Sequence, residues 1–389
     1  MVKTSRTRDL RFEILRIIAM LIIIASHAAW NLSWMLHAFS GMEDVTPNLT
    51  VASYYTVGQW GQVGVVIFFI ITGYFLCNKQ FTAKRVVKSI MQVFFYSITV
   101  LLVTLAAMHL VGAPEYIKAE FTGSSLLLTM LHAVLPILTN TYWFMTAYVV
   151  LLFLQPFINK LIDNISKKQF YALIGLLSVL ALWMEICGFA GLFGSIEYAV
   201  LCYLLGVWVS KYSKKYKKYF TWPKLVAYIV IGFVVVTLFN LLVLKQTDLG
   251  RVLDWLYLIQ ISNGLRVVSI FIGLALVTTF INNLPVKLLH SRKYIVGIVT
   301  TVSVATFGVY MLHEHLLIRR WVWLTMSSLS LPTDGILKVL ALAVVVLIVY
   351  LVATIIAIIL DKAVHAITKC ILNTNACKTM IARIDAVIR

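Results

Sequence analysis

The sequence predicts an all-helical bundle that crosses a membrane about ten times, with both termini in the cytoplasm. Of the 389 residues, 61% are hydrophobic and only 12% are charged. Apolar stretches of span length recur along the chain, and Lys and Arg gather in alternate connecting segments. A soluble globule with a polar exterior cannot be built from this composition, so a membrane protein is expected.

The apolar stretches set the number of spans. A helix needs roughly 20 apolar residues to cross about 30 Å of hydrocarbon. Ten stretches approach that length, at residues 12–30, 56–77, 86–112, 142–163, 169–187, 195–211, 224–244, 257–281, 299–323 and 336–361. We therefore expect a cytoplasmic segment 1–11, a transmembrane domain 12–361 and a cytoplasmic tail 362–389. A shorter apolar run at 126–138 cannot cross and is expected in the interface or as a re-entrant segment.

The distribution of Lys and Arg predicts how the bundle is oriented in the membrane and explains why the net charge is +18. With a cytoplasmic N-terminus, the inner segments carry 25 Lys and Arg and the outer segments carry five. This is the bias that the positive-inside rule demands, so a nucleic-acid partner is not expected. The five cysteines have no repeating spacing and predict neither a disulfide framework nor a zinc site. No metal is predicted.

Two ionisable side chains in the first span require an explanation. Burying an Arg near the centre of a membrane helix costs roughly 2.5 to 3.5 kcal/mol on insertion scales. Arg16 and His27 are eleven residues apart, which returns to within about 20° of the same helix face and separates them by about 16 Å. We expect both to look into one polar cleft. A cation at the inner end suits an anionic donor, and an imidazole farther out suits proton transfer.

Each residue also has a plainer explanation. Arg16 alone could extend to the inner headgroups, and His27 alone could be a hydrogen-bonded buried imidazole. The shared helix face favours the functional interpretation without establishing it.

The first two spans resemble the acyltransferase-3 family of membrane proteins. Glu13, Arg16 and His27 are similar to the family's first signature. The second span resembles its Gly-x-x-Gly-x-x-x-Phe-Phe-x-x-Ser-Gly-Phe stretch, through Gly61, Gly64, Phe68, Phe69, Thr72, Gly73 and Tyr74. Further similarity lies around Arg85, around Trp143 and at residues 304–313. Many members carry a Glu in the Trp-containing motif, whereas this chain has Ala147 and Tyr148, so no carboxylate partner of His27 is assigned there.

The resemblance implies a ten-span bacterial enzyme of the cell membrane that takes an acyl group, here acetyl, from cytoplasmic acetyl-CoA. The acceptor would be a hydroxyl of an extracytoplasmic or lipid-linked surface polysaccharide. By this analogy His27 is the catalytic base, and Arg16 and Arg85 bind the donor. An imidazole can deprotonate a sugar hydroxyl near neutral pH, and guanidinium groups suit the phosphates of CoA.

Other polar residues are candidates for acceptor-side or supporting roles: Glu13, Trp143, Tyr310, His313 and His315. A hydrated helix end explains the two histidines equally well, and an aromatic belt explains Trp143. Because His313 and His315 are two residues apart, they cannot share one helix face, so we expect at most one of them to face the cleft with His27.

A transporter or flippase for lipid-linked sugars is the alternative function. It would also place charged residues in a polar cavity between spans. It does not explain why an Arg and a His share one helix face. Release of free CoA in step with glycan acetylation discriminates the two, because only the enzyme produces it.

Overall fold

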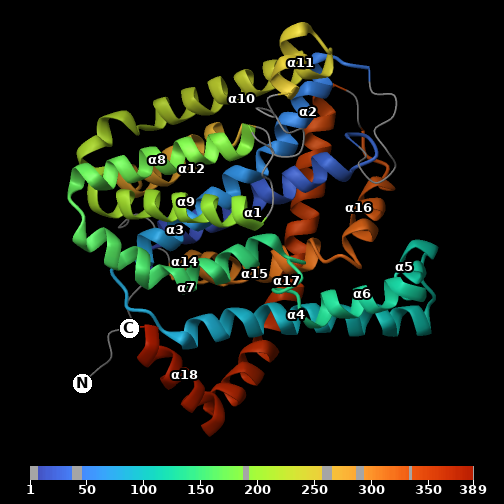
Figure 1. Ribbon diagram of the computed structural model, residues 1–389. Coiled ribbons are helices and arrows are strands. Elements are labelled where there is room, and N and C mark those ends of the chain that lie inside the picture. Colours follow the sequence, from blue (N-terminus) through green and yellow to red (C-terminus); the bar gives the residue numbers. More distant parts are fainter. Residues whose placement is uncertain are drawn as a thin grey trace.

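The computed structural model describes residues 8–36, 46–186, 192–255, 265–285, 293–332 and 335–388. Within these residues the chain forms helices and turns and no strands, which confirms the predicted all-helical class (Figure 1). Parts of the predicted N-terminal segment, of the loop before the second span and of the predicted span 257–281 lie outside the described residues.

Seven helical segments in the described residues are long and apolar enough to cross a membrane. They are α1 (Leu10–Asn31), α2 and α3 together (Leu49–Gln59 and Gly61–Leu76), α4 (Ala83–Leu110), α7 (Trp143–Asn164), α10 (Trp222–Leu244), α12 (Arg266–Asn283) and α17 (Ile336–Asn373). An eighth is present if α14 (Lys293–Val304) and α15 (Thr306–His313), bent by about 40°, count as one span. Helices α8 (Lys167–Ile186) and α9 (Leu192–Tyr212) lie at the predicted fifth and sixth spans, so a total of ten stays a prediction.

One predicted boundary is wrong. The ninth span was predicted over residues 299–323, but α15 ends at His313 and a separate α16 (Arg319–Ser327) follows. A His-Glu-His sequence and two arginines interrupt the apolar pattern there, and these side chains favour a polar site over hydrocarbon. The tenth predicted span, 336–361, lies within α17, which continues to Asn373, and α18 (Asn375–Ile388) follows it.

Helix α3 lies at the centre of the bundle and packs against α1, α9 and α12. Two glycines allow this close approach. A Cβ at Gly64 would overlap the carbonyl oxygen of Ala19 on α1, and one at Gly73 would overlap the carbonyl oxygen of Tyr203 on α9. Membrane helices associate largely through such van der Waals contact, because lipid is as apolar as their side chains. Gly64 therefore lets α1, which carries His27, lie directly against α3, and Gly73 does the same for α9.

Shorter helices cover the ends of the bundle. They are α5 (Glu115–Ala119), α6 (Gly123–Val134), η2 (Ser213–Tyr219) and α11 (Asp248–Trp255). The predicted short apolar run forms α6, which packs on α4. In the view of Figure 1, α17 runs steeply across the neighbouring long helices and passes α4 before it reaches α18.

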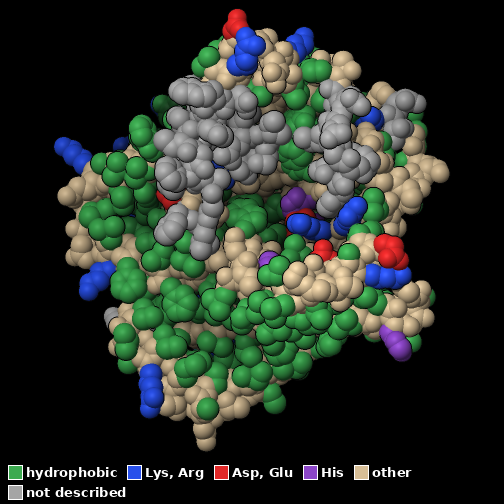
Figure 2. Space-filling view, turned by 45° about the vertical axis from the view of Figure 1, so that its right-hand side comes forward, with side chains coloured by type: hydrophobic (Ala, Val, Ile, Leu, Met, Phe, Trp, Pro, Cys, Tyr) green, Lys and Arg blue, Asp and Glu red, His purple; other side chains and the backbone are tan. Residues whose placement is uncertain are grey.

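Apolar side chains cover much of the exterior. Val230 and Ile231 are exposed on α10, and Leu351 and Ile355 are exposed on α17. Figure 2 shows hydrophobic side chains over the lower part of one face, with a hollow above them where His, basic and acidic side chains gather. An exterior of this kind is suited to lipid, and the polar chemistry is confined to the hollow.

Candidate active site

A cavity of about 180 Å³ opens between α1, α3, α7 and α15. Three residues predicted for the site line it: His27 from α1, Trp143 from α7 and Tyr310 from α15. Ser26 and Gln62 add polar groups to an otherwise largely apolar and aromatic lining. The fold therefore gathers candidates that are more than 100 residues apart in sequence around a single imidazole.

Two neighbours hold the His27 ring. Its Nδ1 lies 3.0 Å from Oε1 of Glu314 and 3.0 Å from Nε2 of His313. The His27 and Glu314 side chains are 25% and 19% exposed, so this pair is largely shielded from solvent. Arg319 interacts electrostatically with both. The break between α15 and α16 brings all these groups beside the end of α1.

The contacts of His313 show which ring nitrogens of His313 and His27 carry a proton. Its Nδ1 lies 2.6 Å from the carbonyl oxygen of Val309, which can only accept, so Nδ1 carries the proton. The Nε2 of a neutral His313 is therefore an acceptor. Nδ1 of His27 then donates to this nitrogen, with Oε1 of Glu314 also 3.0 Å away, and Nε2 of His27 holds the lone pair of the ring. This is the arrangement of a general base oriented by a carboxylate.

His315 lies apart from this group. Its ring packs against Tyr142, with centroids 6.0 Å apart, and its Nδ1 accepts from the backbone N–H of Leu317 at 3.2 Å. It lines a different cavity of about 270 Å³, together with Arg319. Of the two predicted histidines, the structure brings only His313 to His27.

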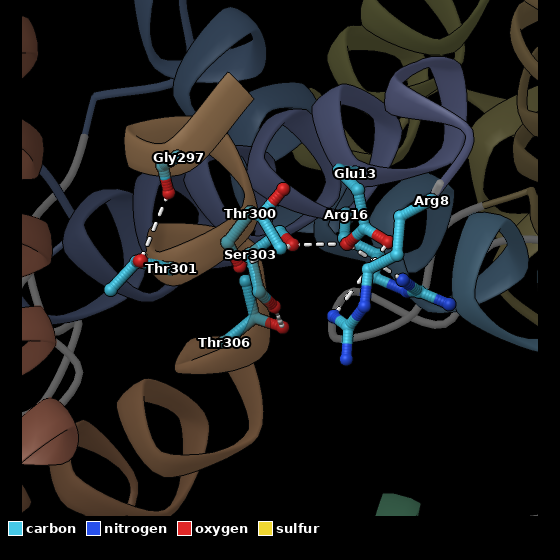
Figure 3. Close-up of polar contacts among 8 residues, drawn as sticks. All are labelled: Arg8, Glu13, Arg16, Gly297, Thr300, Thr301, Ser303 and Thr306. Atoms are coloured by element: carbon cyan, nitrogen blue, oxygen red, sulfur yellow. Dashed lines mark hydrogen bonds and ion pairs between the residues drawn. The ribbon is translucent and has the colours of Figure 1, made fainter. Parts of the chain in front are cut away.

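Glu13 and Arg16 form a buried polar group toward the start of α1. Glu13 is only 4% exposed, and its carboxylate accepts from Nη1 of Arg16 at 2.8 Å and from Oγ of Ser303 (Figure 3). Arg8 approaches the same carboxylate at 3.9 Å. A buried carboxylate needs partners of this kind, so Glu13 holds the Arg16 guanidinium in place and ties α1 to α14.

Arg85 reaches toward α7 from α4. Its Nη1 lies 3.4 Å from Oε1 of Gln155. Arg85 and Arg16 both interact electrostatically with the hydroxyl of Tyr148. The two predicted donor-binding arginines therefore come from different helices and face the same tyrosine.

Aromatic rings separate these arginines from His27. Phe144 and Phe307 line the His27 cavity, and Tyr148 packs on both of them, with its ring centroid 6.4 Å from that of Phe144 and 5.7 Å from that of Phe307. We call Phe144, Tyr148 and Phe307 the aromatic partition. Arg16 does not line the His27 cavity, so the predicted common cleft is divided by this partition.

The His27 group could also hold a divalent metal. One ligand atom from each of His27, His313 and Glu314 lies within 4.8 Å of the others. Two imidazoles and a carboxylate are a ligand set that zinc accepts. Nδ1 of His27 lies in direct contact with both partners, at 3.0 Å from Nε2 of His313 and 3.0 Å from Oε1 of Glu314.

Two residues of the site were not assigned from the sequence. Glu314 is the carboxylate partner of His27, and the His-Glu-His run at 313–315 was its only signal. Gln62 lines the cavity, and its amide forms no hydrogen bond with the residues that the structure describes. Its position directly after Gly61 in the glycine motif was its only signal.

The fold and the site together define a multi-pass membrane protein in which a histidine, paired with a carboxylate, lines a shielded cavity. Residues 9–361 match the acyltransferase-3 family model, which describes an acyltransferase domain. The chain belongs to this family and is a membrane acyltransferase. No curated protein and no solved structure matches the chain at a significant level.

Proposed function

We propose that the protein transfers an acetyl group from acetyl-CoA to a hydroxyl of an extracytoplasmic or lipid-linked surface polysaccharide. The observation that carries this proposal is the His27 ring. Glu314 and His313 occupy its Nδ1, and its Nε2 is left for a substrate in the cavity. A neutral imidazole with this orientation can accept a proton from a sugar hydroxyl near neutral pH.

The reaction needs one proton acceptor and one proton donor. Nε2 of His27 takes the proton of the acceptor hydroxyl while the oxygen of that hydroxyl attacks the thioester carbonyl carbon. A C–O bond forms, the C–S bond breaks, and the proton passes from His27 to the departing CoA sulfur. Glu314 stabilises the transient imidazolium, because its carboxylate lies against Nδ1.

The donor would enter on the side of Arg16 and Arg85. A guanidinium has five N–H donors, so Arg16 can keep its contact with Glu13 and still bind a phosphate. Trp143 and Tyr310 would contact the acceptor, since both line the His27 cavity and aromatic faces pack well against sugar rings. The cavity of about 180 Å³ accommodates the reacting groups rather than a whole polysaccharide chain.

The test compares the acetyl content of the surface glycan in cells that carry wild-type or His27→Ala protein. We expect the variant to reach the membrane at the wild-type level and to leave the glycan without acetyl ester. His109→Ala is the matched control, because His109 is exposed at the far end of α4, and it should retain acetylation. Persistent acetyl ester in the His27→Ala strain would remove the main argument.

The same preparation tests the transporter alternative. Membrane vesicles are supplied with labelled acetyl-CoA, and the release of free CoA is followed. A transferase releases CoA in step with glycan acetylation, whereas a flippase moves the glycan without consuming acetyl-CoA.

A further inference from the structure

A second cavity, of about 790 Å³, lies beside the crossing of α4 and α17. Lys84, Lys88 and Gln92 line it from α4, and one face of α17 lines it from Asp361 to Asn373. This stretch of α17 rises by about 18 Å. The volume is within the range of about 300 to 1,000 Å³ that small-molecule and cofactor sites occupy.

Specific contacts build this cavity. At the crossing, Oη of Tyr96 donates to Oδ1 of Asp361 at 2.9 Å, and Nε2 of Gln92 donates to the same oxygen at 3.2 Å. Beyond the crossing α17 diverges from α4, and α18 returns toward the start of α4 (Figure 1). There the backbone N–H of Ala83 donates to Asp385 at 2.7 Å. Residues of α4 and α17 therefore line the space, together with Val304 and Phe307, and α18 contacts the start of α4.

The charge of the cavity is positive and uncompensated. Lys84, Lys88, Lys362 and Lys369 line it, and none of the four forms an ion pair with the residues that the structure describes. Asp361, the carboxylate among the lining residues, is engaged by Tyr96 and Gln92. Four free ammonium groups around one space favour a ligand with several phosphate charges.

One residue connects this cavity with the His27 cavity. Phe307 of the aromatic partition lines both. Gly308 places it at the crossing, since a Cβ at Gly308 would overlap Oη of Tyr96 and approach Cβ of Ala357. A ligand that reaches from the lysines to Phe307 therefore brings its far end to the ring that borders His27.

We propose that this cavity binds the nucleotide end of the acyl-CoA donor through its 3′-phosphate, which Lys362 and Lys369 hold, while the diphosphate remains the ligand of Arg16 and Arg85. The inference rests on the proposed function, because an acyl-CoA carries its phosphates at one end and its thioester at the other. The thioester end then points to Phe307. Lys362 and Lys369 follow residue 361, where the family match ends, so the match itself assigns them no role.

The test compares two ligands that differ only in the 3′-phosphate. The equilibrium dissociation constants of CoA and dephospho-CoA are measured for purified full-length protein in phosphatidylcholine nanodiscs. Wild type should bind CoA about tenfold more tightly, the effect of several partly exposed ion pairs. The variant Lys362→Gln/Lys369→Gln should bind the two ligands equally. A variant that keeps the wild-type ratio, or a wild-type protein that binds neither ligand, would overturn the proposal.

A matched control and a lipid arm identify the source of any change. Lys214→Gln/Lys215→Gln removes two exposed lysines from η2, remote from the cavity lining, and should keep the tenfold ratio. If the lysines bind phospholipid headgroups instead, Lys362→Gln/Lys369→Gln will differ from wild type in the ratio of the two dissociation constants only in nanodiscs that contain phosphatidylglycerol. That result would overturn the proposal.

Turnover separates this inference from the proposed function. Binding that depends on Lys362 and Lys369, without transfer of acetyl from acetyl-CoA, would contradict the proposed function and leave the phosphate site supported. Transfer that does not discriminate acetyl-CoA from acetyl-dephospho-CoA would contradict the phosphate site alone.

Discussion

Nδ1 of His27 lies 3.0 Å from Oε1 of Glu314, across 287 residues of sequence. This contact joins the first span to the break between α15 and α16. It orients the imidazole so that its other nitrogen remains available in the cavity, and it gives the cation formed during proton transfer a nearby carboxylate.

Glu314→Gln should lower kcat by roughly 100-fold and leave the KM for acetyl-CoA near the wild-type value. The amide preserves the shape of the side chain but does not stabilise an imidazolium. The measurement is CoA release by membrane vesicles that contain the glycan acceptor. Glu115→Gln, which changes a glutamate with an 88% exposed side chain on α5, serves as the control. A kcat equal to wild type would mean that His27 does not depend on this carboxylate.

Arg16→Ala should have two effects that a second substitution separates. It leaves the buried Glu13 carboxylate without its closest cationic partner, so the free energy of unfolding should fall by about 2 kcal/mol. The KM for acetyl-CoA should also rise, by about tenfold, because a phosphate contact is lost.

The double variant Glu13→Gln/Arg16→Ala also removes the carboxylate that Arg16→Ala leaves without its closest cation. It should therefore regain most of the lost stability, which is measured by thermal unfolding in detergent. Its KM for acetyl-CoA should stay raised. Recovery of KM together with stability would show that Arg16 acts only through the fold.

Gln62→Leu should reduce kcat/KM by about tenfold or more with little change in thermal stability. The amide lines the His27 cavity and forms no hydrogen bond with the described residues, so its removal costs the folded protein no contact of that kind. In the reaction it can donate to the acceptor or to the developing oxyanion. Gln80→Leu, at an exposed position after the second span, should behave like wild type. Unaltered kinetics in Gln62→Leu would exclude this role.

Chelation should leave the activity intact. The proposed mechanism uses the direct contacts of His27 Nδ1 with His313 and Glu314 and no metal. Added Zn²⁺ should inhibit, because two imidazoles and a carboxylate are a zinc ligand set and an occupied Nδ1 disturbs the base. Acetyl transfer is measured after treatment with a chelator and during titration with zinc. Loss of activity on chelation and recovery with zinc would contradict the proposed mechanism.

Much of the fold was predictable because lipid imposes strict rules on a chain. A span must be long, apolar and helical, since backbone groups in hydrocarbon have no water to pair with. These rules located α1, α4, α7 and α10 to within a few residues. They did not locate the end of the predicted ninth span, where the helix stops at His313, and Glu314 and His315 contact His27 and Tyr142 of other segments.

Part of the site could also be predicted from the sequence. The spacing of Arg16 and His27 on one helix depends only on helix geometry, and the resemblance to the acyltransferase-3 family added Arg85. The position of Tyr310 and Trp143 in the His27 cavity depends on how α7 and α15 pack against α1, which no local pattern encodes.

The sequence by itself determined that this chain is a helical membrane protein and that its first apolar span carries two ionisable side chains, Arg16 and His27. Only the tertiary structure decided that Glu314 is the partner of His27, that the aromatic partition separates His27 from Arg16, and that α17 extends into a basic cavity. The reason is physical. Span length and helix phase are properties of consecutive residues, whereas a hydrogen bond or a cavity wall depends on where distant helices cross.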